Sequence, residues 1–471
     1  MAQRPKKGDA HGSKPGSRLV AVARRFLSFM DSYTKHFWVY NGDQSPNAFI
    51  YLKGLTKSNL NKNMERMTEA DPEANYQSIQ HFITDSSWSA RNVMDHVAQN
   101  VNTLIGDPYG SGLIIDESGD VKKGKSSVGV ARQWIGNVGK VENGQVGVYA
   151  SLVNGINYSL VNARLYLPEE WTSDKKRLDK AKVPEAERIF KTKETIALEL
   201  VLQARQQKLE YGWVGTDAGY GKGLDFPLKL EHLGETFVVD VHKDQLVHLE
   251  EPQLEVPAYS GRGRKPEKPR PNPKPIRADK IALTQPEDAW QKIAVREGTK
   301  GMIEYEYIFQ RVWIYSEEHE AIRQWHLIIR RDVETKSDVK YTFSNAPTET
   351  SKQRLAYMQA QRYWVERSFE EGKQNCGMAD YQHRKWLSWH HHMALVMMAL
   401  LFLMMEKMEN QNETPLLTGR DITELLTFYL QKPPTEEEVF RRMEIRHEKR
   451  RRDMKNAAKR RRRSFGKLGL V

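Results

Sequence analysis

The chain has 471 residues, of which 39% are hydrophobic and 28% are charged, and its formal net charge is +12. This length and composition suit a soluble globular protein of two or three domains with a substantial core. The single cysteine, Cys376, excludes an intramolecular disulfide and any cysteine-cluster metal site, and it fits a reducing cytosol.

The first half of the chain changes from a helical to a strand-like pattern. Residues 1–18 are rich in Gly, Lys and Pro without an apolar segment, which indicates a disordered basic N-terminus rather than a secretory signal. Residues 19–108 show helical periodicity, and the stretch "TDSSWSARNVMDHV" from Thr84 offers Ser and Asp caps before an apolar run. We therefore expect a helical domain over residues 19–108.

Strands are predicted from Gly112 onward. Asn143–Gly144 and Asn154–Gly155 are typical turn pairs between them, and a helix is predicted from Lys193 to Lys208. The strand-like runs are "GLIID" (112–116), "SVGVARQWIG" (127–136), "QVGVYASLV" (145–153), "YSLVNARLYLP" (158–168), "GWVGT" (212–216) and "TFVVDVHK" (236–243). Strands in hairpin order, followed by a helix and more strands, predict a mixed α/β sheet.

A proline-rich, basic segment at 251–277 interrupts this pattern and indicates a polyproline-like linker or surface arm. Antiparallel strands are then predicted at 302–316, 324–332 and 339–346, and helices from Glu349 onward. The apolar run Met393–Met405 has 13 residues, whereas a bilayer needs about 20. We expect it to be a helix buried in a large core.

The C-terminal tail carries most of the net charge. Residues 441–471 contain 14 Lys/Arg and 3 Asp/Glu, which amounts to +11. A basic tail beside a balanced body indicates a polyanionic partner, most often nucleic acid, and the alternative is a solvated or disordered end.

Three acidic residues are candidates for chemistry. Asp116 and Asp217 each follow a strand, where a rigid sheet presents functional groups, and Glu366 shares one helical stripe with Arg362 and Lys373. Carboxylate oxygens without His or Cys favour Mg²⁺ or Mn²⁺, and two such ions about 4 Å apart can activate a water or 3′-OH in phosphodiester chemistry. Glu117 should point to the opposite side of its strand from Asp116.

Simpler interpretations remain open for these residues. An aspartate after a strand is more often a turn former or a helix cap, and pairing with Arg362 would fully explain Glu366. Two other patterns are unpromising. His390–His392 are consecutive, so they point around a helix rather than to one metal, and "GTDAGYGKG" lacks the spacing of a P-loop.

Three blocks resemble the DDE transposases of bacterial insertion sequences, in their cut-and-paste branch. The long block that starts "LIIDESGDVKKGK" resembles the region of the first aspartate, and "GWVGTDAGYG" resembles the strand of the second. "RYWVERSFEEGKQ" resembles the helix of the third acid, whose pattern is Y-x2-R-x3-E-x6-K. Arg362, Glu366 and Lys373 fall in register with it, and Gln359 stands at the tyrosine position. The resemblance covers roughly residues 20–405.

The resemblance implies an RNase H-like catalytic core with Asp116, Asp217 and Glu366 as catalytic and metal-binding triad, holding two Mg²⁺ ions for which Mn²⁺ can substitute. It also implies a β-rich insertion between the second Asp and the Glu. The implied division is a disordered N-terminus (1–18), a helical DNA-binding domain (19–108), the first part of the core (109–242), the insertion (243–345) with its basic arm (251–277), the second part of the core (346–410) and a C-terminal helical region with the basic tail (411–471).

The predicted function is therefore a DNA transposase of the bacterial cytoplasm, associated with the nucleoid, that binds the terminal inverted repeats of its element and target DNA as a synaptic homodimer. It would cleave DNA by metal-dependent hydrolysis and join the 3′-OH ends by transesterification. The residues expected to contact DNA are Arg362, Lys373, Lys122, Lys123, Lys125, Trp364 and Trp325, together with the arm at 262–277 and the tail. The alternatives are an RNase H-like nuclease without integration activity and a non-catalytic, domesticated transposase.

Overall fold

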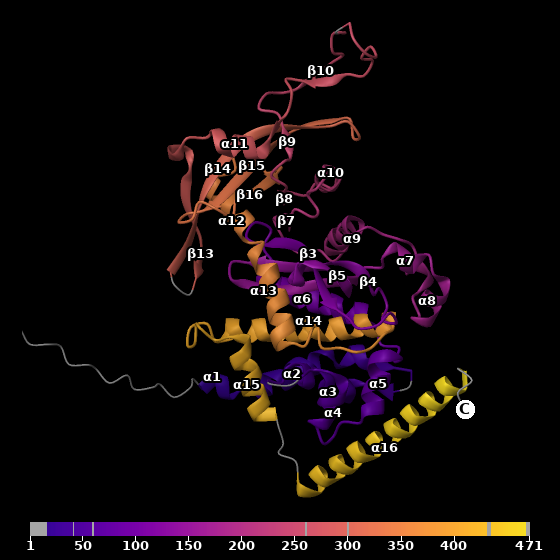
Figure 1. The fold of residues 1–471 in the computed structure, drawn as a ribbon. Helices are drawn as coiled ribbons and strands as arrows, with labels where there is room; N and C mark the ends of the chain where they lie inside the picture. Colours follow the sequence, from indigo (N-terminus) through magenta and orange to yellow (C-terminus); the bar gives the residue numbers. More distant parts are fainter. Residues whose placement is uncertain are drawn as a thin grey trace, which may run out of the picture.

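A ten-stranded mixed sheet runs through the middle of the protein, with helices packed against it (Figure 1). The computed structural model describes residues 17–40, 42–58, 61–259, 261–298, 301–430 and 435–467. The mixed α/β architecture predicted from the sequence is confirmed, and it is consistent with an RNase H-like fold. The expectation for residues 1–16 lies outside the described residues.

The segment before the sheet is helical, as predicted. Ser89 caps its last and longest helix by accepting a hydrogen bond from the backbone N–H of Asn92. Its elements are α1 (Ser17–Val20), α2 (Val22–Tyr33), η1 (Thr34–Phe37), β1 (Trp38–Val39), β2 (Gly42–Asp43), α3 (Ser45–Leu55), α4 (Met64–Glu69), α5 (Tyr76–Thr84) and α6 (Ala90–Ile105).

An interior strand of the sheet, β3 (Gly112–Val121), pairs with an antiparallel strand on one side and a parallel strand on the other. The strands around it are β4 (Ala131–Ile135), β5 (Lys140–Asn154), β6 (Asn157–Leu165), β7 (Trp213–Thr216) and β8 (Phe237–Val241), with η2 (Gly136–Val138) between β4 and β5. β3 pairs antiparallel with β5 and parallel with β7, and β7 pairs parallel with β8. Three neighbouring parallel strands therefore end at the same edge of the sheet.

The predicted turn at Asn143–Gly144 is wrong. Both residues lie inside β5, and the chain turns instead at η2 and Gly139, whose φ is +63°. Gly144 serves close packing rather than a turn, because a Cβ there would lie 2.5 Å from the backbone oxygen of Asp120 on β3. The second predicted turn is confirmed, since Gly155 has φ +60° between β5 and β6.

The strands after residue 290 extend the central sheet. They are β13 (Gln291–Gly298), β14 (Gly301–Ser316), β15 (Ala321–Asp332) and β16 (Lys340–Ser344), and β16 pairs antiparallel with β8. The basic arm contains one short antiparallel pair, and the end of the arm pairs with a strand that precedes it. These elements are β9 (Leu246–Val247), β10 (Gln253–Glu255), β11 (Arg270–Asn272) and β12 (Ile276–Arg277), followed by α11 (Ala278–Thr284) and η4 (Glu287–Ala289).

The remaining helices pack on the sheet or continue toward the C-terminus. They are α7 (Glu169–Thr172), α8 (Lys175–Lys180), η3 (Glu185–Glu187), α9 (Lys193–Gln206), α10 (Asp225–His232), α12 (Lys352–Ala360), α13 (Tyr363–Asn375), α14 (Trp386–Glu409), α15 (Gly419–Leu430) and α16 (Glu436–Lys467). The sequence pattern predicted helical structure from Glu349 onward, with Arg362 on the same helix as Glu366. In the structure the helix is interrupted at Gln361–Arg362, although neither Gly nor Pro occurs there.

The predicted buried helix is α14. By length and composition it could cross a membrane, but 89% of its most apolar window is buried inside the protein. It lies between the N-terminal helices and the sheet, contacting α3, α5, α6 and β6 (Figure 1). The helices before residue 106 and the sheet therefore share one hydrophobic core, which contains Phe26 and Phe82 as well as Leu113 and Leu400.

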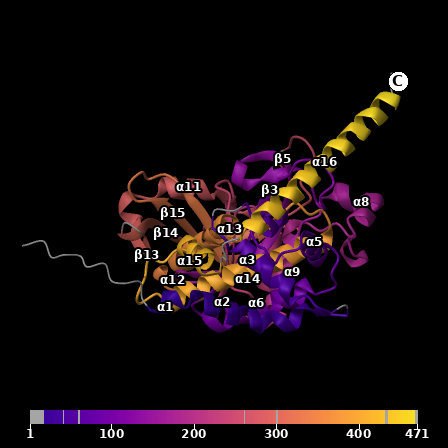
Figure 2. The ribbon, with the colours of Figure 1, turned by 90° about the horizontal axis from the view of Figure 1, so that it is seen from below.

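The last helix, α16, extends along the outside of the body (Figures 1 and 2). Its 32 residues span about 48 Å at 1.5 Å per residue. Nearly all of its described side chains are exposed, and Lys449 pairs with Glu65 of α4. Most of the basic tail is thus presented on a single exposed helix.

Candidate active site

Three aspartates come to the same level at the ends of the parallel strands. The register pairs Ile115 with Thr216 and Thr216 with Val239, so the next residues are Asp116, Asp217 and Asp240. Because side chains alternate along strands, these three lie on one face of the sheet. Asp240 was not among the site residues predicted from the sequence. Its signal was the same as for the other two, an acid late in an apolar strand, "FVVDV".

Arg362 contacts two of these aspartates and also contacts Glu366. Its Nε lies 3.2 Å from Asp240 Oδ2, its Nη1 lies 3.6 Å from Asp116 Oδ2, and its Nη2 lies 3.1 Å from Glu366 Oε1. The break between α12 and α13 places Arg362 immediately before the first turn of α13, which contains Glu366. The helix and the strand ends thus meet at one guanidinium.

The acids of this site differ in exposure. The side chain of Asp116 is 12% exposed, whereas that of Glu366 is 55% exposed and reaches toward solvent. Local backbone groups hold the two strand acids. Asp116 Oδ1 accepts from the N–H of Glu117 at 2.7 Å, and Asp217 Oδ1 accepts from the N–H of Gly219 at 3.0 Å. Glu117 instead pairs with Lys193 of α9, at 2.6 Å.

The electrostatics show a site with more negative charge than its own cation balances. Burial raises the pKa of Asp116 well above its ordinary value, the neighbouring Asp217 raises it further, and Arg362 opposes the shift. Burial lowers the pKa of Arg362, but Asp240, Asp116, Glu366 and Asp217 outweigh it, so the pKa is raised overall. A buried carboxylate beside a second, half-buried carboxylate favours an additional cation.

The donor set fits a hard divalent cation in its chemistry, because carboxylate oxygens are the ligands that Mg²⁺ and Mn²⁺ prefer. Among the residues that the structure describes, the buried hydroxyl of Tyr220 beside these acids has no hydrogen-bond partner, which leaves a polar group available to a further ligand. Within the described ranges, no group of three or more His, Cys, Asp or Glu side chains is close enough to hold an ion. Glu366 must therefore exchange its contact with Arg362 to join the aspartates at a cation.

Lys373 fastens the same helix to β3 further along. Its Nζ donates to the backbone oxygen of Gly119 at 3.1 Å and lies 3.4 Å from Asp120 Oδ1. Asp120 stands four residues after Asp116, on the same face of the strand. The stripe of Arg362, Glu366 and Lys373 predicted from the sequence thus faces β3.

The three lysines after β3 differ in availability. Lys122 is engaged within the protein, because its Nζ lies 3.5 Å from the centre of the Tyr381 ring and 3.4 Å from that residue's backbone oxygen. Lys123 and Lys125 are exposed. The structure therefore leaves Lys123 and Lys125 free to meet a partner, and it gives Lys122 a packing role.

The two candidate tryptophans also differ. Trp325 is 1% exposed, its ring packs against Phe237 and Phe343, and its indole N–H donates to Glu231. It belongs to the core and offers no ring face to a base, so the expectation for Trp325 is withdrawn. Trp364 is half-buried on α13 and stacks on Tyr158, with ring centres 5.3 Å apart.

The consecutive histidines contact three different parts of the fold. His390 contacts the backbone oxygen of Trp386, and His391 contacts those of Ile83 and Trp88. His392 accepts from the hydroxyl of Tyr51 through Nδ1 and donates to Gly377 through Nε2. They serve packing around α14 rather than one shared site.

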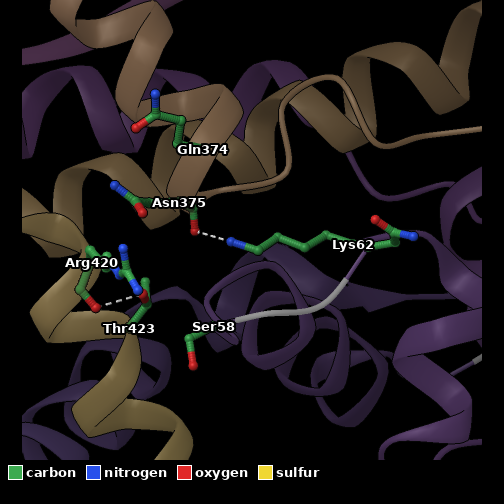
Figure 3. A pocket seen from close by; sticks show the side chains of 7 residues that line it. Ser58, Lys62, Gln374, Asn375, Arg420 and Thr423 are labelled. Carbon is green, nitrogen blue, oxygen red and sulfur yellow. Dashed lines mark hydrogen bonds between the residues drawn. The ribbon is translucent and has the colours of Figure 1, made fainter.

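The C-terminal end of α13 borders a polar pocket of about 480 Å³ (Figure 3). Lys62 extends across it and donates to the backbone oxygen of Asn375, and burial lowers the pKa of this lysine. Arg420 and Thr423 of α15 line the opposite wall. The helix that carries Glu366 is therefore fixed at its C-terminal end as well as at β3.

Comparisons with known proteins agree with this geometry. A family model described as DDE superfamily endonuclease matches residues 39–302, a range that includes the three aspartates and ends before Glu366. A relative from Microchaete diplosiphon, described as a probable transposase for insertion sequence element IS701, is 29% identical over 228 residues. The match covers 47% of this chain and 56% of the relative, so the chain matches little more than half the length of that relative. Since the family model spans more than half of the 471 residues, the chain belongs to the DDE superfamily endonucleases.

Proposed function

We propose that this protein is a DNA transposase that binds the ends of an insertion sequence, cleaves DNA by phosphodiester hydrolysis and joins the freed 3′-OH ends to target DNA. The observation that carries the proposal is the convergence of Asp116 and Glu366 on the guanidinium of Arg362, with Asp217 level with Asp116 at the end of the neighbouring parallel strand. Membership of the DDE endonucleases and the similarity to a probable insertion-sequence transposase support it.

In this proposal Asp116, Asp217 and Glu366 hold two Mg²⁺ ions, which Mn²⁺ can replace. When bound, such ions activate a water or a 3′-OH and stabilise the leaving oxygen. Arg362 and Lys373 present cationic donors beside the acids, where a scissile phosphodiester has to approach. The half-buried ring of Trp364 lies on the same helix, two residues before Glu366, where it can contact a displaced base.

Duplex DNA is the proposed partner, and exposed basic segments supply the phosphate contacts. These are Lys123 and Lys125 after β3, the arm at 262–277 and the exposed helix α16. We further propose that residues 19–108 recognise the terminal repeats, that 109–242 and 346–410 form the catalytic core with 243–345 inserted and 411–471 following, and that a synaptic homodimer acts in the bacterial cytoplasm at the nucleoid.

The test is cleavage and joining of labelled element ends in Mg²⁺. Asp116→Asn, Asp217→Asn and Glu366→Gln should each abolish cleavage while the protein still binds the DNA ends. Glu117→Gln is the matched control, because this neighbouring acid pairs with Lys193 on the other face of β3. Cleavage that survives in any of the three variants would remove that residue from the proposed triad.

A strand-transfer assay with pre-cut ends separates the proposal from its rivals. Joined product supports a transposase, whereas nicking without joining supports a nuclease that lacks integration activity. Binding without nicking or joining in either metal supports a non-catalytic descendant of a transposase.

A further inference from the structure

The three kinds of nitrogen of Arg362 have different partners. Nη1 and Nη2 face Asp116 and Glu366, which the proposed function assigns to cations. Nε faces Asp240, an acid that has no role in that function. One carboxylate therefore holds Arg362 at Nε, and the two terminal nitrogens of the guanidinium face two other carboxylates.

Asp240 is itself fixed by a chain of buried polar groups. Its Oδ1 accepts from the hydroxyl of Thr342 at 2.6 Å, and that hydroxyl accepts from Gln359 Nε2 at 3.0 Å. Thr342 is fully buried and Gln359 is 5% exposed. Because the Thr342 proton goes to Asp240, the amide nitrogen of Gln359 must face the hydroxyl, so each member orients the next. Gln359 occupies the position where the third-acid pattern expects tyrosine.

The partners of Asp240 distinguish an anchor from a cation ligand. One of its oxygens is taken by Thr342 and the other by Arg362, and its side chain is 13% exposed. In the described part of the chain, Asp116 and Glu366 have no such relay on the oxygens that face Arg362. The same guanidinium thus has one partner that is fixed by neutral hydrogen bonds and two partners that a cation would compete for.

We propose that Asp240 is a positioning residue that, with Thr342 and Gln359, anchors Arg362 through Nε. The anchor keeps the guanidinium in place when a divalent cation takes Asp116 and Glu366, and it leaves Nη1 and Nη2 to bind a phosphate oxygen. Without it, the described carboxylates that still contact Arg362 are Asp116 and Glu366, and Arg362 competes with the cation for them. The inference rests on the proposed function for the identity of the cation and of the phosphate.

The first experiment needs neither metal nor DNA. Melting temperatures in EDTA are compared for Asp240→Asn, Arg362→Gln and the double variant. We expect the double variant to lose no more than the larger single loss, because both substitutions remove the same contact. The control pair is Asp338→Asn with Arg362→Gln, since Asp338 lines the same pocket but pairs with Arg330. The losses of melting temperature in this control pair should add. Additive losses for Asp240→Asn and Arg362→Gln as well would overturn the proposed anchor.

The second experiment measures the apparent Mn²⁺ affinity from the rise of the melting temperature with MnCl₂. Asp240→Asn should weaken Mn²⁺ binding by about tenfold, as loss of an outer-sphere partner does. In the Arg362→Gln background the same substitution should have no effect. A tenfold loss that persists there would show that Asp240 acts as a ligand or a local charge, and it would overturn the inference.

Thr342→Val tests the relay without a change of charge. It should weaken Mn²⁺ binding in the same direction as Asp240→Asn, whereas Thr342→Ser, which keeps the hydroxyl, should not. Equal affinities for the Val and Ser variants would overturn the role of the relay. If Mn²⁺ fails to stabilise even the unmodified protein, the proposed metal site is wrong, and the cycle in EDTA still decides whether Asp240 anchors Arg362.

Discussion

Two glycines in the loop after β7 are predicted to respond very differently to substitution by alanine. Gly221 is buried, and a Cβ built on it would lie 2.0 Å from the backbone oxygen of Asp240 and 3.0 Å from Val239 Cγ1. Gly223, two residues later, has nothing within 4 Å of the same added atom. The Gly221→Ala substitution therefore forces the loop away from the strand that carries Asp240, and Gly223→Ala does not.

The size of the effect follows from the overlap. A methyl carbon and a carbonyl oxygen need about 3.3 Å, so the two backbones must separate by roughly 1 Å. Overpacking of this kind costs about 1–3 kcal/mol of stability. A displacement of about 1 Å among positioned catalytic groups lowers rates by about 10²-fold. Asp217 and Asp240 stand on either side of this contact, so cleavage should suffer more than folding.

The assay is nicking of labelled element ends in Mg²⁺, with a thermal melt of each variant to follow the fold. We expect Gly221→Ala to remain folded with a lower melting temperature and about 10²-fold slower nicking, and Gly223→Ala to match the unmodified protein in both. Equal nicking rates for the two variants would refute the claim that this close contact sets the spacing of the aspartates.

Three further predictions concern the rest of the molecule. Burial lowers the pKa of His392 to about 3, below its unfolded value of about 6.5. The stabilisation that neutral His392 contributes is therefore complete above the unfolded pKa and is lost as the pH falls below that value. The loss at pH 5 is on the order of 2 kcal/mol. His392→Asn should therefore shrink the drop in melting temperature between pH 7 and pH 5, and an unchanged drop would contradict this. Arg25→Met should cost about 3–5 kcal/mol in urea unfolding, because Glu406 is 2% exposed and loses its bidentate partner. Arg24→Met, on the exposed side of the same helix, should change little, and equal losses would argue against the ion pair. Truncation before residue 441 should weaken DNA binding and flatten its dependence on salt, and an unchanged slope would exclude α16 from the interface.

The sequence predicted the elements well because their periodicity is a local property. The apolar run in "GLIID" (112–116) and the caps around 84–97 depend on neighbours within a few residues, and they lie in the strand Gly112–Val121 and at the start of the helix Ala90–Ile105. The strand ends of Asp116 and Asp217 were visible for the same reason. Their sharing one level with Asp240 depends on the order of β3, β7 and β8 in the sheet, which a single sequence does not contain.

Residues whose surroundings depend on distant parts of the chain were the hardest to place from the sequence. Trp325 and Lys122 were predicted to contact DNA from their residue type and position. The first is packed between Phe237 and Phe343, and the second is held at Tyr381, 259 residues further along the chain. The break at Gln361–Arg362 was equally invisible, because it follows from packing of α12 and α13 on different strands rather than from a helix-breaking residue.

The two basic side chains at the helix of Glu366 contact the rest of the fold and are also proposed to contact the substrate. They have enough N–H donors for both. Lys373 has three N–H donors and directs them at two acceptors on β3, Gly119 and Asp120, which leaves one for a phosphate. Arg362 has five and faces three carboxylates. Lys373 need not release β3 before it meets DNA, so α13 can stay docked while a cation displaces the contacts of Arg362 with Asp116, at 3.6 Å, and with Glu366, at 3.1 Å. The 3.2 Å contact with Asp240 is not among those displaced, and this is why an acid without a place in the triad can decide how Arg362 meets the phosphate.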